Sequence, residues 1–196
     1  KVTATEGKLT LTATDMEVGI RLELDENVEI ETEGTALLPV QRTMAILRES
    51  NDETLTLETD DSGIRVLGTH SKFRLPGSNP DEFPNVSGFD EEKYHVIPTR
   101  LLREMIRRTV FATDSETSRY ALGGVLVEME EERVTAVGPD GRRLARMEGS
   151  GEPIGGHQTS GMTTIVPTRA IQLIERALDE KEETVDVATR SNDLLV

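Results

Sequence analysis

The chain has 196 residues, 35% of them hydrophobic and 30% charged, a balance typical of a folded globular chain of one or two domains. It has no cysteine, so disulfides, thiolate catalysis and cysteine-ligated metal sites are excluded. A formal net charge of -15 disfavours nucleic-acid binding over the whole surface, and 3% aromatic residues argue against base stacking on single strands. Any bound nucleic acid is therefore expected to be a duplex held by its phosphates at a local basic patch.

Strands are indicated by alternation of apolar and polar residues, the pattern of antiparallel sheets with one wet face. The expected strands are residues 9–15, 54–60, 63–69, 72–77, 124–130, 133–138 and 184–189. No apolar run approaches the roughly 18 residues that span a bilayer, so no membrane association is expected. Lys1 stands inside an alternating pattern and Val196 closes an apolar triplet, so both ends are expected to continue into a longer protein.

Helices are predicted where the spacing changes, and each predicted helix opens on a proline, at Pro39, Pro98 and Pro167. Proline favours a helix start because its missing amide proton has no partner to lose there. About three strands follow a helix each time, so helix plus strands forms an internal repeat. The stretch 75–92 is rich in Pro, Gly, Asn and acids and is interpreted as the boundary between two domains. The expected fold class is α+β.

Basic residues recur in register along the three helices. Nine residues after each proline stand Arg48, Arg107 and Arg176, and the second helix also carries Arg100 and Arg103. At about 100° per residue these offsets share one helix face. The opposite face of the second helix is apolar and is expected to lie on a sheet; it consists of Leu101, Leu102, Met105, Ile106 and Val110. An ordinary solvated face is one interpretation of the arginines, and a surface that meets an anion is the other.

Catalysis has little support in the sequence. No nucleophile elbow, P-loop or dinucleotide fingerprint occurs, and His70, His95 and His157 stand in separate segments, which favours solvated histidines over a metal site. Two alternatives remain. One is a structural adaptor whose arginines bind an acidic protein. The other is a metal-dependent phosphoesterase that uses the carboxylates Asp15, Glu17, Asp60 and Asp61.

A family resemblance rests on motifs spread over the whole chain, and these stand in the expected order. They are TATDMEV, SKFRLPGSNPDEFPNV, SRYALGGVLVEME, VGPDGRRLAR and TTIVPTRAIQLIE, together with the three proline-led helices. The chain resembles the beta subunit of bacterial DNA polymerase III, the sliding clamp family. Where the family usually has Thr-Asp-Gly-His-Arg-Leu-Ala, Pro139 replaces the threonine and Arg142 the histidine.

The resemblance implies a DNA clamp fold, in which helices line one face and sheets form the other. It implies most of the first clamp domain in residues 1–87 and most of the second in residues 88–196, with the third absent. A non-catalytic processivity factor is implied, without cofactor or metal, in the cytoplasm. Its implied partners are double-stranded DNA of any sequence, the polymerase III catalytic subunit, the clamp loader and other proteins with a clamp-binding motif, and a second copy in a homodimeric ring.

Two sets of site residues follow from the resemblance and from the arginine register. The side chains expected to face DNA are Arg48, Arg100, Arg103, Arg107, Arg119, Tyr120, Arg169 and Arg176. The residues expected to form an apolar cleft for a partner peptide are Leu122, Pro139, Gly141, Arg142, Arg143 and Leu144. Without the resemblance, the second set would be interpreted as a turn between two strands.

Overall fold

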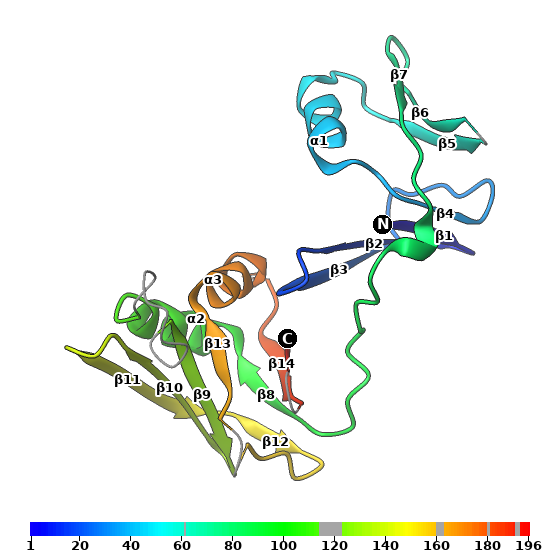
Figure 1. The fold of residues 1–196 in the computed structure, drawn as a ribbon. Helices are drawn as coiled ribbons and strands as arrows, with labels where there is room; N and C mark the ends of the chain where they lie inside the picture. Colours follow the sequence, from blue (N-terminus) through cyan, green and yellow to red (C-terminus); the bar gives the residue numbers. More distant parts are fainter. Residues whose placement is uncertain (61, 114–122, 160–162, 180, 191–192) are drawn as a thin grey trace. The chain divides into compact units, whose positions relative to one another are not determined.

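The computed structural model describes the chain except for residues 61, 114–122, 160–162, 180 and 191–192. Its contacts divide it into two compact units, Lys1–Gly88 and Phe89–Val196, here called the first and second unit. All paired strands are antiparallel, and helices alternate with them along the chain (Figure 1). The prediction of an α+β fold is confirmed.

The first unit holds two sheets and one α-helix among its described residues. One sheet has the strand order β3-β2-β1-β4 and the other the order β5-β6-β7. The elements are β1 Val2–Thr5, β2 Lys8–Thr14, β3 Gly19–Leu24, β4 Gly34–Ala36, α1 Val40–Glu49, β5 Thr56–Asp60, β6 Gly63–Leu67, β7 Lys72–Leu75 and a short 3-10 helix, Pro80–Glu82.

The core of the first unit is small. Ile46 from α1 packs with Ile64, Val66 and Leu75 from the second sheet. Ile46 is the one buried residue of α1, whereas Val40 and Leu47 on the same helix remain 69% and 56% exposed. Helix α1 therefore makes only a small buried contact with its sheet.

The second unit also holds two sheets, with the strand orders β11-β10-β9-β13 and β12-β8-β14-β15. Helices α2 and α3 contact each other, and both contact the first of these sheets, so they cover one face of it side by side (Figure 1). The elements are β8 Tyr94–Pro98, α2 Thr99–Val110, β9 Gly124–Glu130, β10 Arg133–Pro139, β11 Leu144–Ser150, β12 Glu152–Ile154, β13 Ile165–Pro167, α3 Thr168–Ala177, β14 Thr184–Thr189 and β15 Leu194–Leu195.

The predicted repeat is confirmed at its helix starts. Pro39, Pro98 and Pro167 are each the residue directly before α1, α2 and α3, and the last two also end a strand. The fixed φ of proline suits the extended backbone at that junction as well as a first helical turn. The strand count is less regular, because four described strands separate α1 from α2 and five separate α2 from α3.

Helix α2 lies unusually close to its sheet at Gly138 on β10. A Cβ atom added there would stand 2.1 Å from the carbonyl oxygen of Thr109, in the last turn of α2. Since that oxygen belongs to the backbone, no side-chain rotation could relieve the overlap. Backbone contact, and not side-chain packing, thus sets the height of this helix end above β10.

Two histidines lie in the core of the second unit, contrary to the expectation that all three are solvated. His95 is 0% exposed and His157 is 5% exposed, and their Nδ1 atoms are 2.7 Å apart. The backbone N–H of Thr189 donates to Nε2 of His157, so this nitrogen carries no proton. His157 then donates through Nδ1 to His95, and His95 donates through Nε2 to the carbonyl oxygen of Glu131, 2.7 Å away.

A proton on Nε2 of His157 would set two N–H groups against each other, so this arrangement suits a neutral His157 ring. Burial lowers the pKa of His157, and the neighbouring His95 ring lowers it further, while Glu91 opposes the change. The third histidine, His70, is solvated as expected, with its side chain 88% exposed.

Within the described part of the chain, no helix is long and apolar enough to cross a membrane.

Candidate nucleic-acid and peptide interfaces

The buried face of α2 agrees with the predicted stripe. Leu102, Met105 and Ile106 are buried, with Met105 only 1% exposed, and Leu101 and Val110 are half-buried. The apolar positions recur every three to four residues, so they form one stripe along the helix, against the sheet.

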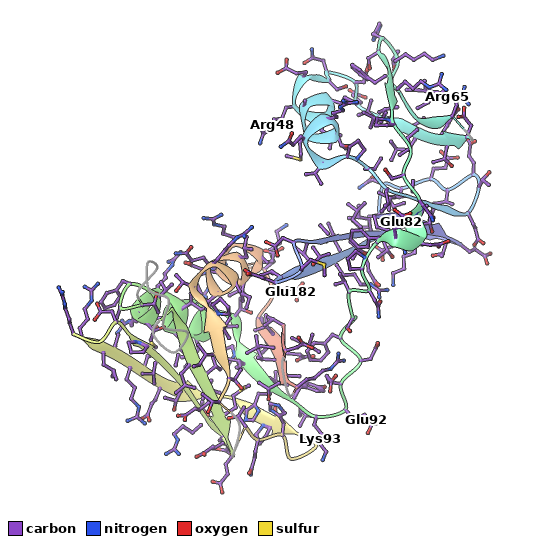
Figure 2. The ribbon with its side chains drawn as sticks, in the orientation of Figure 1. Arg48, Arg65, Glu82, Glu92, Lys93 and Glu182 are labelled. Carbon is purple, nitrogen blue, oxygen red and sulfur yellow. The ribbon has the colours of Figure 1, made fainter. Side chains whose placement is uncertain are left out.

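The predicted DNA-facing arginines mostly reach solvent. Arg103 is half-buried, and the exposed ones are Arg48, Arg100, Arg107, Arg169 and Arg176. Arg48 extends from α1 in the first unit (Figure 2). The other four belong to α2 and α3, which lie side by side, so the second unit gathers positive charge on its helical surface. Arg119 and Tyr120 lie outside the described residues.

Two of the arginines on α2 are tied to α3. Nη2 of Arg103 donates to the carbonyl oxygen of Leu178, 2.6 Å away, at the C-terminal end of α3. Nε of Arg107 donates to Oε1 of Glu175, also at 2.6 Å. A cation near the carbonyl end of a helix is favourable because it complements the helix dipole. These contacts align the two helices, and the Glu175 carboxylate offsets part of the positive charge of the helical surface.

Glu175 and Leu178 were missed by the sequence analysis, which compared only basic positions among the helices. A weak signal existed, because Glu175 is an acid that stands one residue before Arg176 on the predicted helix. A second acid of the helical surface, Glu104, pairs with Arg108 one turn along α2. The helical surface therefore carries acidic as well as basic side chains.

The carboxylates proposed for a metal-dependent phosphoesterase instead close turns. Oδ1 of Asp15 accepts from the backbone N–H groups of Glu17 and Val18, and Oδ1 of Asp60 accepts from that of Ser62. Among the described residues, no group of three or more acidic or histidine side chains gathers as a metal site. Asp61 lies outside the described residues.

The predicted cleft residues cluster at the turn between β10 and β11. Pro139 and Leu144 pair as the last and first residues of the two strands, and Gly141 in the turn adopts a φ of +85°, which glycine accepts without strain. Oδ1 of Asp140 accepts from the backbone N–H groups of Arg142 and Arg143, each at 2.9 Å. These bonds hold the pKa of Asp140 below its usual value, with the Arg143 side chain adding to the effect.

Apolar and cationic side chains are exposed around this turn. Nη2 of Arg143 donates to the carbonyl oxygen of Phe111, 3.0 Å away, and its guanidinium lies 5.6 Å from the centre of the Phe111 ring. Phe111 is 59% exposed and Leu144 is 65% exposed. Phe111 follows the last residue of α2, and the sequence analysis missed it because only contact through Arg143, 32 residues away, brings it to the turn. Leu122 lies outside the described residues.

Comparisons with known proteins cover both units. The family described as "DNA polymerase III beta subunit, N-terminal domain" matches residues 1–87, and "DNA polymerase III beta subunit, central domain" matches residues 96–196. A protein of Halalkalibacterium halodurans named "Beta sliding clamp" is 28% identical over the whole chain, which covers 53% of that relative. The chain thus spans about half the length of the curated relatives it matches.

Solved structures agree with these matches. "Caulobacter crescentus pol III beta" is 28% identical with a TM-score of 0.84, and the match covers 98% of this chain and 52% of that one. A Helicobacter pylori beta clamp bound to a DNA ligase peptide is 21% identical with a TM-score of 0.82, and the match covers 96% of this chain and 52% of that one. At that lower identity the likeness concerns the fold alone.

Proposed function

Because this chain belongs to the DNA polymerase III beta subunit family, we propose that it is part of a sliding clamp. Such a clamp encircles duplex DNA and keeps the replicative polymerase on it, as a non-catalytic processivity factor. In this proposal residues 1–87 belong to the first clamp domain and residues 88–196 to the second. The intact protein would form a homodimeric ring in the cytoplasm, which sedimentation of the full-length protein tests directly.

One observation carries the DNA-binding part of the proposal. A chain with a formal net charge of -15 exposes Arg100, Arg107, Arg169 and Arg176 on two adjacent helices. Arginine binds phosphate oxygens through a planar set of N–H donors and carries no base information when it does so. A surface of this kind attracts duplex DNA without preferring any sequence, as a ring that moves along DNA requires.

The test is duplex binding by the full-length protein over a range of salt concentrations. Arg100→Glu and Arg176→Glu are expected to weaken binding equally for unrelated sequences and to reduce the log-log salt slope by about 0.9 for each lost phosphate contact. Arg146→Glu is the matched control, because Arg146 lies on the face of β11 opposite to Gly149, which contacts Leu101 of α2. A salt slope unchanged by the helix variants would refute the proposal, and an altered sequence preference would mean that the arginines read bases.

The surface beside the β10–β11 turn suits a partner peptide. Exposed Leu144 offers an apolar contact, and the neighbouring Arg143 offers a charged rim with Phe111 beside it, which fits a short segment with an apolar anchor and an acidic flank. In this proposal, the site receives the polymerase III catalytic subunit, the clamp loader and other proteins with a clamp-binding motif. Pro139, Gly141 and Arg142 would shape its edge, together with Leu122.

Titration of a labelled clamp-binding peptide against the full-length protein tests this site. Leu144→Ala is expected to weaken peptide binding about tenfold or more, because an apolar anchor in such a site supplies much of the affinity. Leu57→Ala is the matched control, since Leu57 is also exposed but lies on β5 in the first unit. Equal affinity of the Leu144→Ala variant and the wild type would remove Leu144 from the site.

A further inference from the structure

The pairing of Arg107 with Glu175 places an acid on the surface of α2 and α3, which is proposed to bind DNA through its arginines. Arg107 is 65% exposed on α2, and Glu175, on the adjacent helix α3, is 23% exposed. The carboxylate accepts from Nε of Arg107 at 2.6 Å, a short charge-assisted hydrogen bond. Glu175 is thus held against the guanidinium in the way that a phosphate would be.

Carboxylate and phosphate oxygens make the same kind of hydrogen bond with arginine. We propose that Glu175 competes with DNA phosphates for Arg107 and so lowers the affinity of the helical surface for DNA. The inference rests on the proposed function and names a residue that regulates the same surface. The ligand of this surface is the phosphate backbone of a DNA duplex.

The neighbouring contact supports this interpretation of the surface. Arg103, one turn before Arg107, already donates to the carbonyl oxygen of Leu178. Arg103 therefore has fewer N–H donors left for a phosphate, whereas Arg100 near the start of the helix is exposed. Each phosphate contact adds affinity and steepens the salt dependence of binding. An internal anion that occupies one such contact keeps the attraction weak while leaving the helices aligned.

The experiment compares Glu175→Gln with the wild-type full-length protein on a short linear duplex. Glutamine keeps the shape of the side chain and removes its charge, so Arg107 becomes available to a phosphate. The variant is expected to bind more tightly and to gain about 0.9 in the log-log salt slope. Its advantage over the wild type should therefore grow about threefold between 200 and 50 mM salt.

A matched control separates competition from a general change of charge. Glu104→Gln removes the same charge from the same helical surface, but Glu104 pairs with Arg108 and not with Arg107. If Glu104→Gln binds DNA as tightly as Glu175→Gln, the effect is one of net charge and the inference is wrong. In an Arg107→Gln background, Glu175→Gln should bring no gain, and a gain that persists there would also overturn it.

The inference and the proposed function fail in different ways. Absence of duplex binding by the wild type would refute the proposed function. Wild-type binding with an unchanged Glu175→Gln variant would refute only the competition at Arg107. If Glu175→Gln does not fold, as judged by thermal melting, Glu175→Ala provides the same comparison in the same assay.

Discussion

Helices α1 and α2 begin in the same way after a proline, yet they differ in how much of each is buried. Met44 on α1 is 42% exposed, whereas Met105 on α2 is 1% exposed. Only Ile46 is buried on α1, while α2 buries a full stripe and has α3 beside it. Most of the buried apolar side chains among the described residues belong to the second unit.

The difference separates what starts a helix from what stabilises it. A proline followed by apolar residues at helical spacing sets the position of both helices, but their own sequence does not decide how much of them is covered. Coverage depends on neighbouring elements, and in the second unit the adjacent helix and a four-stranded sheet provide it. The second unit is therefore expected to be the more stable of the two.

The largest expected effect compares the two methionines. Met105→Ala should lower the unfolding free energy of the second unit by about 2–5 kcal/mol, because it leaves a cavity in a close-packed core. Met44→Ala should change the first unit by only about 0.5 kcal/mol or less. Hydrogen exchange in increasing urea, followed on peptides from each unit, measures both. Similar losses in the two units would contradict the comparison.

A smaller effect is expected where the helix touches its sheet. Gly138→Ala should cost the second unit about 1–3 kcal/mol, because the added methyl group would overlap the backbone of α2. Gly34→Ala is the control in the first unit, since a Cβ atom at Gly34 meets nothing within 4 Å. Urea unfolding of both variants checks the prediction, and equal midpoints would mean that α2 can rise from β10 at little cost.

Acid is expected to weaken the second unit selectively. The pKa of His157 is lowered in the folded chain, so below about pH 6.5 the unfolded state binds a proton that the native state does not. Stability from this group is therefore complete above that pH and is lost as the pH falls. Glu91, whose charge opposes the shift, is itself paired with Arg190. Two further acids lie nearby in the sheet, Asp186 and Glu152. Both pair with Val96, the residue after His95, so they lie on the face of the sheet opposite to the His95 side chain.

Exchange of second-unit peptides at pH 7.5 and pH 5.5 measures this effect. His157→Gln should remove part of the difference between the two pH values, whereas His70→Gln, a change at an exposed histidine of the first unit, should leave it unchanged. A wild-type second unit equally stable at both pH values would contradict the lowered pKa of His157.

The smallest effect concerns surface ion pairs, where the two units should not differ. Arg21 pairs with Glu23 on β3, and Arg146 pairs with Glu148 on β11, each on the edge strand of a sheet. Because exposed pairs gain little in water, Arg21→Ala and Arg146→Ala should leave the urea midpoints unchanged within error. A clear loss in only one unit would mean that the difference extends beyond the core.

Much of the fold could be predicted from sequence because local periodicity of apolar residues indicates strands and helices. The strand predicted at residues 124–130 occupies those positions, as does the one at 184–189, and all three helices begin where proline indicated. The strands not predicted as such include β4, β8, β11, β12, β13 and β15, which are short or lack clear alternation.

The contacts that refine the candidate sites could not be predicted in this way. His95 and His157 are 62 residues apart in sequence, and Arg107 and Glu175 are 68 apart. Periodicity tells which face of an element a side chain occupies, but it carries no information on which distant side chain will lie opposite. The sequence thus indicated where arginines gather, and only the fold identified their acidic partner.

The buried histidine pair also has a consequence for chemical reactivity. Reagents that acylate histidine are electrophiles, and the lone pair of an unprotonated ring nitrogen attacks them. On His157 that lone pair accepts the Thr189 N–H, and on His95 it accepts a hydrogen bond from His157, deep in the core. Of the three histidines in the chain, His70 alone is open to such a reagent in the folded protein. Acylation of the other two would then count how often the second unit opens, with His70 as the internal standard.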